Sequence, residues 1–448
     1  MQSVIIRHAT VVTQGELGTL QADVLVENGL ITAVGTDVSA PDDAREIDAT
    51  GCIVTPGVVQ THVHLCQTAF SGLAEDLDVM SWLDQWIWPL EQALDADTMS
   101  ASARWGVAEM LLSGTTSFLS METTHHTDQA FQAAADLGAR ATIGKAIMDR
   151  EEPGTRLLGE STEAAWADLV RLVETWHGSY DDRIRVAVSP RAPSAATPQM
   201  WADSVALASQ HDLTIHTHVN ENRGQSDKVS EANGTRDVLL LSELGALGPR
   251  TVLAHCVWLE DEEVTLLAGS GTTVAHCPTA NLKLGSGIAN VPRLRGHGVN
   301  VGLGTDGAAC NNTLDARREL FLASIIHRAS GDPQAMPASQ AFDMATLNGA
   351  RALGREGELG AIAVGMIADI AVFRAPQFTA RTGESAVDHL VYSGSTVTVS
   401  SVLVGGELVV HDGQLVNGDI ATIRAEGAAA RATLAYAVAA TRTVGDER

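Results

Sequence analysis

The two ends of the chain share a pattern of short apolar runs separated by turn residues. Residues 3–13 and 22–35 read as strands, and Asn28-Gly29 inside the second run is typical of a tight hairpin turn. Residues 368–373 and 401–415 show the same pattern, with Gly and Asp-Gly turns. The pattern predicts one small β domain, formed from residues 1–56 together with residues 364–418.

Between these ends, apolar strand-like runs alternate with helix-length segments, which is typical of a parallel α/β fold. Every run except the last is followed by a helix-length stretch before the next begins. Eight such units predict a (β/α)8 TIM barrel over residues 57–363, and an Ala-rich C-terminal helix follows over residues 419–448. The eight runs cover residues 58–64, 115–121, 140–148, 183–190, 213–219, 251–256, 272–278 and 300–306.

Composition and charge exclude several classes of protein. The five cysteines are odd in number and lack CxxC spacing, so neither a disulfide framework nor a zinc ribbon is indicated. Acidic residues outnumber basic ones 55 to 29, and a net charge of −26 repels phosphate backbones and anionic lipid. No apolar run reaches the roughly 18 residues of a membrane span, and the N-terminus lacks the pattern of a signal peptide. We therefore expect a soluble cytoplasmic protein that binds neither nucleic acid nor membranes.

Polar residues gather at the C-terminal ends of the predicted strands, where a barrel keeps its active site. His62 and His64 leave the first strand on the same face, because side chains alternate with a period of two. His218 closes the fifth strand and Asp306 the eighth. A lone His-x-His is often a chance pair or a pair of core histidines, but the shared position on several strands argues against that here. Three imidazoles and a carboxylate converging on one barrel mouth predict a site for one divalent ion, zinc or ferrous iron.

Two further residues are candidates for proton transfer. His255 closes the sixth strand, where it would orient or deprotonate a metal-bound water; its alternative role is that of a second metal ligand. Glu221 follows His218 by three residues and can face the same water without binding the metal. A carboxylic acid there can take a proton from that water and hand it to a substrate nitrogen. The alternative for Glu221 is an exposed loop position.

The remaining polar and aromatic residues near the strand ends are predicted to have structural or rim roles. Lys145 invites comparison with a carbamylated lysine that bridges two metals, but that chemistry needs a lysine on the fourth strand, and Lys145 lies on the third. One metal is therefore favoured. The residues given structural or rim roles are His125, His126, His216 and His276, together with Trp82, Trp86 and Trp88, whose near-helical spacing indicates packing.

Five segments stand in one order along nearly the whole chain: PGVVQTHVH, HTHVNE, LAHCVWL, AHCPTANLKLGSGIA and GLGTDGAACNN. Together they resemble the amidohydrolase superfamily, and within it the branch of chlorohydrolases and aromatic-ring deaminases. The resemblance implies a barrel with a β-sandwich made from both termini, and one divalent metal, commonly zinc or iron. It assigns the metal to the residues matching His62, His64, His218 and Asp306, with His255 and Glu221 as proton-handling groups.

The resemblance also implies a hydrolytic mechanism. Water whose pKa is lowered by the metal attacks a ring carbon that carries an amino group. Asp306 and His255 hold and deprotonate that water, and Glu221 protonates the neighbouring ring nitrogen and assists the loss of ammonia. Because an amine leaves badly without a proton while chloride needs none, Glu221 favours deamination over dehalogenation.

Traces of two subfamilies bear on the substrate. Gln67 and Arg191, with the segments IGKAIMD and HVNENR, are similar to guanine deaminases, in which the matching Gln and Arg bind the purine edge. The segments WPLE, NLKLGSGIA and TDGAACNN look like deaminases of S-adenosylhomocysteine, methylthioadenosine and related nucleosides. In those enzymes the residue matching Glu91 binds ribose hydroxyls.

The chain departs from both subfamilies. An aromatic residue normally follows the arginine of guanine deaminases, where this chain has Ala192. The nucleoside deaminases usually carry a histidine at Arg191 and an arginine at Lys145. Arg156 is a candidate to receive an amino-acid carboxylate, and Trp88 lies on the segment that covers the pocket and can join subunits in relatives, which implies a homo-oligomer.

The sequence therefore predicts a metal-dependent aminohydrolase with a small-molecule substrate. The substrate is expected to be an aminopurine base or an adenosine-type nucleoside, of the guanine, S-adenosylhomocysteine or methylthioadenosine class. Two alternatives stay open: hydrolysis of a triazine substituent (amine or chloride) or of a cyclic amide, and a catalytically silent scaffold on the same fold.

Overall fold

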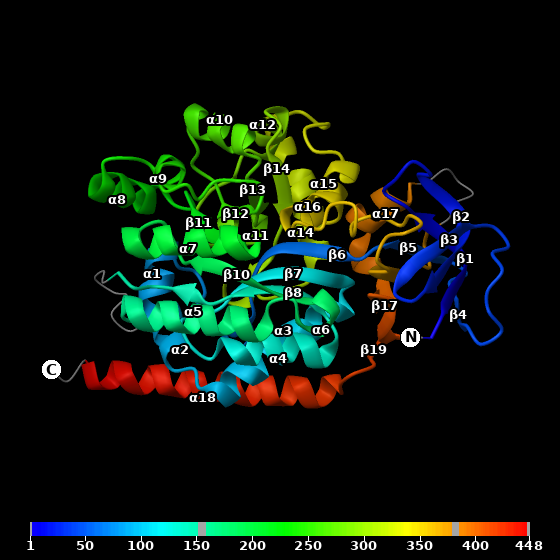
Figure 1. Ribbon diagram of the computed structural model, residues 1–448, viewed down its shortest axis with the longest axis horizontal. Helices are drawn as coiled ribbons and strands as arrows, with labels where there is room; N and C mark the ends of the chain where they lie inside the picture. Colours follow the sequence, from blue (N-terminus) through cyan, green and yellow to red (C-terminus); the bar gives the residue numbers. More distant parts are fainter. Residues whose placement is uncertain (1, 151–157, 379–384, 446–448) are drawn as a thin grey trace.

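The computed structural model describes residues 2–150, 158–378 and 385–445. Within them, eight parallel strands close into a barrel with helices outside it, as the sequence predicts (Figure 1). β6 pairs with β7 on one side and with β14 and β15 on the other, and these pairings close the ring. The barrel strands are β6 (Val58–His64), β7 (Thr115–Met121), β8 (Arg140–Gly144) with β9 (Ala146–Ile147), β10 (Ile184–Pro190), β11 (Thr214–Val219), β12 (Thr251–His255), β13 (Thr273–His276) and β14 (Asn300–Leu303) with β15 (Asp306–Gly307).

The helices that cover the barrel begin and end at residues suited to those positions. The Asp95 side chain accepts a hydrogen bond from the Thr98 amide in a capping box at the start of α3, and Gly138 ends α4 with a left-handed backbone. The principal outer helices are α3 (Ala96–Leu112), α4 (Thr127–Leu137), α5 (Thr162–Trp176), α7 (Pro198–His211), α8 (Arg223–Asn233), α9 (Asp237–Glu243), α10 (Asp261–Ser270), α12 (Val291–Gly296), α14 (Ala316–Ile325), α15 (Ala338–Met344) and α16 (Leu347–Ala352).

Shorter helical segments follow the strand ends. After β6 come the 3-10 helix η1 (Leu65–Phe70), α1 (Val79–Trp82), a π-helical turn η2 (Leu83–Ile87) and α2 (Trp88–Gln92). The other short elements are α6 (Ser179–Asp182), α11 (Pro278–Lys283), α13 (Ala308–Asn311), η4 (Ile326–Ser330), α17 (Ala386–Tyr392) and η6 (Gly394–Thr396).

The barrel interior is filled rather than open. Val59, Leu119, Ala187, Val252 and Ala275 from the strands form one buried apolar cluster with Ala352 and Leu353, which lie at the end of α16. Gly349 of α16 packs so closely on β6 that an added Cβ would lie 2.7 Å from the Val59 Cβ. The N-terminal side of the barrel is therefore plugged, and space for a ligand remains at the C-terminal ends of the strands.

Both ends of the chain contribute to a separate mixed sheet, as predicted, in the described part of the protein. β16 pairs antiparallel with β5 and so joins the C-terminal strands to the N-terminal ones. Asn28 and Gly29 both have positive φ in the hairpin between β2 and β3, which is the turn expected from their sequence. The strands are β1 (Val4–Val12), β2 (Thr19–Glu27), β3 (Leu30–Gly35), β4 (Arg45–Asp48), β5 (Cys52–Pro56), β16 (Ile370–Arg374), β17 (Thr398–Val404), β18 (Glu407–His411) and β19 (Gln414–Leu415).

A buried ion pair ties this sheet to the barrel. Arg140 at the start of β8 donates two hydrogen bonds to Asp369, at 2.9 and 3.0 Å, and the same carboxylate accepts bonds from Ser117 Oγ and the Gly405 amide. Such a forked and fully hydrogen-bonded pair fixes orientation as well as charge.

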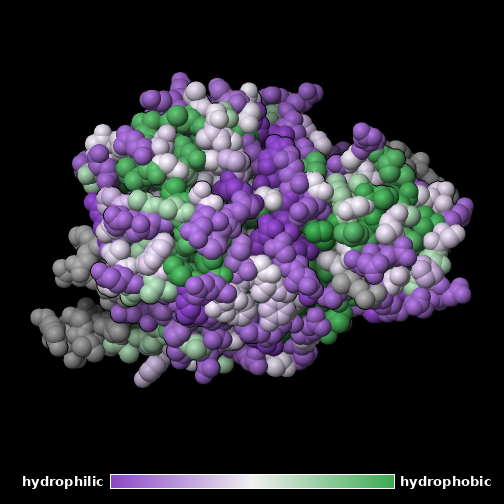
Figure 2. All heavy atoms as spheres, viewed as in Figure 1, coloured by the Kyte–Doolittle hydropathy of each residue, from purple (hydrophilic) through white to green (hydrophobic). Residues whose placement is uncertain are grey.

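The long C-terminal helix α18 (Ile420–Gly445) runs along the outside of the barrel and packs on α3 (Figure 1). Hydrophilic residues cover much of the face seen in Figure 2, interrupted by hydrophobic patches on the barrel and on the terminal sheet. Among the described helices, none combines the length and the apolar character needed to cross a membrane.

Candidate active site

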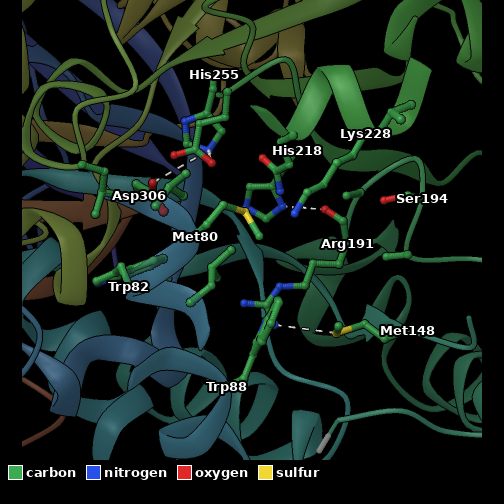
Figure 3. A pocket seen from close by; sticks show the side chains of 18 of the residues that line it. Met80, Trp82, Trp88, Met148, Arg191, Ser194, His218, Lys228, His255 and Asp306 are labelled. Carbon is green, nitrogen blue, oxygen red and sulfur yellow. Dashed lines mark hydrogen bonds and ion pairs between the residues drawn. The ribbon is translucent and has the colours of Figure 1, made fainter. Parts of the chain in front are cut away.

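The C-terminal strand ends bring four histidines and one aspartate together, as Figure 3 shows for three of them. His62 and His64 come from β6, His218 from β11 and His255 from β12, while Asp306 begins β15. The Asp306 Oδ1 atom lies 3.4 Å from His62 Nε2 and 3.3 Å from His64 Nε2, and the Nε2 atoms of His64 and His218 are 3.2 Å apart. The ligand-capable atoms fall into two overlapping groups that could hold a metal ion: His62, His64 and His218; and His62, His255 and Asp306.

The other ring nitrogen of each of His62, His64 and His218 has a hydrogen-bond partner, and for His64 and His218 that partner fixes the proton. His64 Nδ1 lies 2.6 Å from the Met121 carbonyl oxygen, and His218 Nδ1 lies 2.6 Å from the Arg191 carbonyl oxygen. Both Nδ1 atoms must therefore donate, so Nε2 is the atom of each ring that can bind a metal. Burial alone would lower the pKa of His64, but the Asp306 carboxylate outweighs it and raises that pKa. His62 Nδ1 lies 2.8 Å from His216 Nε2, so the predicted core histidine His216 orients His62.

These residues fit a bound cation. Two nitrogen lone pairs 3.2 Å apart repel each other unless a positive charge lies between them, and two zinc-bound nitrogens in tetrahedral geometry are about 3.3 Å apart. His62 Nε2 is buried and has no hydrogen-bond partner in the described part of the chain. Burial lowers the pKa of His62 to about 4 and that of His218 well below its ordinary value. Both imidazoles are thus neutral near pH 7, which is the metal-binding form.

Asp306 is ionised although it is buried. Burial alone would raise the pKa of this carboxyl, but His62 and His64 outweigh it and hold the pKa well below its usual range. Asp306 and His255 both have positive φ, at 62° and 72°. Non-glycine residues adopt this left-handed backbone at a cost of about 1 kcal/mol or more, and such positions concentrate at functional sites.

Glu221 and His255 face the same point from two sides of the cluster. His255 Nδ1 lies 2.9 Å from Asn281 Oδ1, which indicates a proton on Nδ1 and a free lone pair on Nε2. That Nε2 lies 3.8 Å from Glu221 Oε2 and 3.9 Å from Asp306 Oδ2. Burial raises the pKa of Glu221, which favours its protonated form. Glu221 thus lies beside the metal-binding cluster with its protonated form favoured.

Three polar side chains form a network at the inner wall of the cavity. Arg191 donates two hydrogen bonds to the buried carboxylate of Glu91, at 2.6 and 3.0 Å, and Gln67 Nε2 donates a third at 3.0 Å. Because a carboxylate only accepts, the Gln67 amide is oriented with its nitrogen toward Glu91. Its Oε1 is then buried without a hydrogen-bond partner among the described residues. Burial alone would raise the pKa of Glu91, but the Arg191 charge holds it below its usual value.

A cavity of about 400 Å³ opens from this cluster, a size typical of small-molecule sites. Gln67, Arg191, Glu221 and Asp306 line its inner part. The rest of its wall is mostly apolar and comes from the segment after β6, from the loops after β9 and β10, and from α8. These apolar lining residues include Val79, Met80, Trp82, Leu83, Trp88, Met148, Ala195 and Val229.

The structure brings nearly all predicted site residues to one place. His62, His64, His218, His255, Glu221 and Asp306 surround the inner end, Gln67, Arg191 and Trp88 line the cavity, and Glu91 lies directly behind Arg191. Arg156 falls outside the described residues. Lys145 has no place in the cavity wall, because its Nζ is buried in ion pairs with Glu160 and Asp168 at 2.8 and 3.1 Å.

Several cavity residues were not predicted from the sequence. Trp82 packs in the core as expected, but it also lines the cavity. Asn281, the partner of His255, lies in the quoted motif NLKLGSGIA, so proximity to that motif could have identified it. Gln225, Lys228, Val229 and Ala232 recur at helical spacing on the helix that directly follows Glu221, and all four line the cavity.

Comparison with known proteins agrees with this geometry. A sequence model described as the amidohydrolase family matches residues 53–409. The 5′-deoxyadenosine deaminase of Methanothermobacter thermautotrophicus is 41% identical over 92% of this chain and 94% of its own length. The 5-methylthioadenosine/S-adenosylhomocysteine deaminase of Syntrophobacter fumaroxidans is 38% identical over 89% and 90%.

Three solved structures have the same fold. An adenosine deaminase from Xanthomonas campestris with bound zinc is 30% identical, with a TM-score of 0.88 over 97% of this chain and 98% of that one. Atrazine chlorohydrolase from Arthrobacter aurescens TC1, complexed with zinc, is 26% identical, with a TM-score of 0.88 over 96% and 100%. Escherichia coli guanine deaminase is also 26% identical, with a TM-score of 0.80 over 92% and 100%. With the family match spanning most of its length, the chain belongs to the amidohydrolase family.

Proposed function

We propose that this protein is a zinc-dependent deaminase that releases ammonia from the adenine ring of an adenosine-type nucleoside. Its expected substrates belong to the class of 5′-deoxyadenosine, methylthioadenosine and S-adenosylhomocysteine, which relatives of 38% and 41% identity are named for. The observation that carries the proposal is the position of Glu221, a buried carboxyl of raised pKa beside the metal-binding cluster and in the wall of the cavity. Amine loss requires a proton donor at that place.

The metal would be held by His62, His64, His218 and Asp306. The chemistry of this donor set supports zinc, since neutral imidazoles and one carboxylate are ordinary zinc ligands, and two of the solved relatives contain zinc. When bound, zinc supplies a Lewis acid that lowers the pKa of water toward neutrality.

The protein groups then divide the proton transfers between them. His255 Nε2 has a free lone pair and accepts the proton that the attacking water loses, and Asp306 holds that water by its second oxygen. Glu221 donates its proton to the ring nitrogen next to the attacked carbon. The C–N bond to the amine then breaks as His255 gives its proton to the departing amine, which leaves as ammonia, and the Glu221 carboxylate takes the hydroxyl proton as the ring carbonyl forms. Ser286 Oγ donates a hydrogen bond to Glu221 Oε1 at 3.3 Å, which leaves Oε2 to face His255 and the reacting ring.

The inner network would bind the part of the substrate next to the reacting ring. Arg191, held in place by Glu91 behind it, supplies donors, while the unpartnered Gln67 Oε1 supplies an acceptor. Hydroxyl groups both donate and accept, so this combination suits ribose hydroxyls. The apolar wall that includes Met80 and Trp82 would pack on the flat ring and exclude water.

Deamination of guanine is a second candidate, favoured by one observation. Gln67 and Arg191 both line the cavity, and the buried Gln67 Oε1 lacks a donor among the described residues. The amino and imino groups of guanine are donors and could supply that bond. The Arg191–Glu91 pair would in that case bind the acceptor edge of the base.

Ammonia release from the zinc-loaded enzyme tests the proposal and separates the candidates. A suitable panel contains guanine, adenosine, 5′-deoxyadenosine, methylthioadenosine, S-adenosylhomocysteine, cytosine and an aminotriazine. We expect ammonia from the 5′-modified adenosines, and the Glu221→Gln variant to lose about 10²- to 10⁴-fold in kcat while it retains zinc. Ammonia from guanine alone would favour the second candidate. Silence across the panel with zinc bound would point to hydrolysis of another ring substituent.

We also propose that the enzyme works in the cytoplasm as a homo-oligomer. All five cysteines are free and buried, which suits a reducing compartment. Sedimentation that gives the mass of a single chain at working concentration would contradict the oligomer.

A further inference from the structure

The outer wall of the cavity carries three polar side chains whose partners are missing. Lys228 and Gln225 project from α8, and Ser194 lies in the loop after β10; all three line the cavity. Figure 3 shows the Lys228 side chain extending from its helix toward the side of the cavity on which His218 and Arg191 lie. In the described part of the chain, none of the three side chains makes a hydrogen bond or an ion pair.

An unpaired lysine is unusual in this chain. Only three lysines stand against 55 acidic residues, and the other two are ion-paired: Lys145 with Glu160 and Asp168, and Lys283 with Glu75. Glu231 lies one turn beyond Lys228 on the same helix, yet no ion pair joins them. The exposed Lys228 side chain thus lines the cavity without a described acidic side chain to neutralise it.

The second cationic side chain of the cavity is already neutralised. The Arg191 guanidinium is forked onto Glu91 at the inner wall, which leaves Lys228 as the uncompensated positive charge among the described lining residues. An ammonium, an amide and a hydroxyl lining one cavity offer the hydrogen-bond donors that a carboxylate or phosphate group requires. A chain of net charge −26 would otherwise repel a substrate that carries such a group.

We propose that Lys228, with Gln225 and Ser194, forms a receptor for an anionic group at the end of the substrate remote from the reacting ring. The inference rests on the proposed deaminase function and adds a specificity determinant to it. Lys228 supplies charge, and its neighbours supply hydrogen bonds. Because the receptor lies at the outer wall, it selects the 5′ substituent and leaves the chemistry at the ring unchanged.

A pair of isosteric nucleosides tests this receptor. 5′-Deoxy-5′-(2-carboxyethylthio)adenosine carries a carboxylate, and its primary amide has the same shape without the charge. In the wild-type enzyme we expect the acid to be preferred, and in Lys228→Gln we expect the acid-to-amide ratio of kcat/KM to fall about tenfold, mostly through KM. Lys228→Arg should keep most of the ratio. Adenosine 5′-monophosphate as a third substrate tells whether the receptor also takes phosphate.

Two controls separate this effect from general electrostatics. Arg45→Gln removes one positive charge from the exposed surface of the terminal sheet and should leave the ratio at its wild-type value. Raising the salt concentration should reduce the acid-to-amide ratio of kcat/KM more in the wild type than in Lys228→Gln. Salt screens the partly exposed pair that Lys228 would form with the substrate carboxylate.

The results also distinguish the two hypotheses. If both nucleosides release ammonia and the acid-to-amide ratio of kcat/KM is unchanged in Lys228→Gln, the receptor proposal is overturned. The deaminase proposal is unaffected by that result. If the wild type released no ammonia from either nucleoside, calorimetric binding of both ligands to the zinc-loaded Glu221→Gln variant would decide. The receptor is supported there if the acid binds more tightly than the amide and is overturned if it does not.

Discussion

The polar side chains at the inner end of the cavity have hydrogen-bond partners in the protein, whereas those at the outer end do not, among the described residues. At the inner end, His64 and His218 each hold a backbone carbonyl, and Arg191 is forked onto Glu91. At the outer end, Lys228, Gln225 and Ser194 make no side-chain bond with described residues. The inner groups are therefore fixed before a substrate arrives, whereas the outer groups remain available to bind one.

This difference follows from which elements carry the residues. Except for Glu91 on α2, the inner groups stand at the ends of barrel strands, whose hydrogen-bonded pairing fixes their positions, as between Asp306 and Val63 or Val219 and His255. The outer groups stand on α8 and on connecting loops, which can vary without disturbing the barrel. The two proposals thus assign the chemistry to one end of the cavity and substrate choice to the other.

The largest expected effect comes from the inner end. Asp306→Asn removes the only carboxylate of the proposed metal site while keeping the size of the side chain. Asn also tolerates the positive φ of this position, so backbone strain does not confuse the result. We expect the zinc content to fall below one per chain and ammonia release to fall at least about a thousandfold. Elemental analysis and a rate assay on the same preparation measure both.

A variant with full zinc content and a wild-type rate would contradict the assignment of Asp306. A variant that keeps zinc but loses the rate would assign Asp306 to proton transfer alone, with His255 as the remaining candidate for the fourth ligand.

The next effect concerns the ion pair behind the inner wall. Glu91→Gln leaves the guanidinium of Arg191 buried without its counter-charge, and breaking a buried pair in this way costs about 3–5 kcal/mol. Lys228→Gln has no partner to lose, so its free energy of unfolding should change by less than about 0.5 kcal/mol. Urea unfolding of the zinc-loaded variants measures this contrast directly.

The double variant Glu91→Gln/Arg191→Gln is the matched control for the pair. If the single variant is destabilised by the uncompensated charge, removal of that charge should restore part of the lost stability. Strictly additive losses would mean that packing, not the ion pair, accounts for the effect of Glu91→Gln.

The sequence predicted the residues at the strand ends better than those on helices and loops. The strand runs and the residues that end them, such as His218 and Asp306, were predictable because strand periodicity and barrel closure bring all eight strand ends to one rim. The Arg191–Glu91 pair was not, since each residue resembled a separate substrate-binding position of a different subfamily. Lys228 was missed because a polar helix carries no motif, and its exposure to the cavity depends on how α8 packs on α9.

The smallest expected effect concerns Asp237, which helps to position α8 at the outer wall of the cavity. Asp237 begins α9, and its Oδ2 accepts a hydrogen bond from Asn220 Nδ2 at 3.3 Å; the same amide bonds to Ser226 of α8. Burial raises the pKa of Asp237 to about 6 from an ordinary 3.8. The folded protein therefore holds this proton more tightly than the unfolded chain does. The associated stability is fully present below pH 3.8 and is lost as the pH rises through 6.

Asp237→Asn mimics the protonated side chain at every pH. Relative to the wild type, we expect the variant to gain on the order of 1 kcal/mol in stability between pH 5 and pH 8, because only the wild type must ionise a buried carboxyl. Hydrogen exchange of the α8 and α9 amides at the two pH values would show the same difference locally. An equal change at both pH values would mean that the Asp237 contacts, not its charge, hold α8 against the cavity. The anion receptor on α8 would then rest on a wall whose position does not depend on pH.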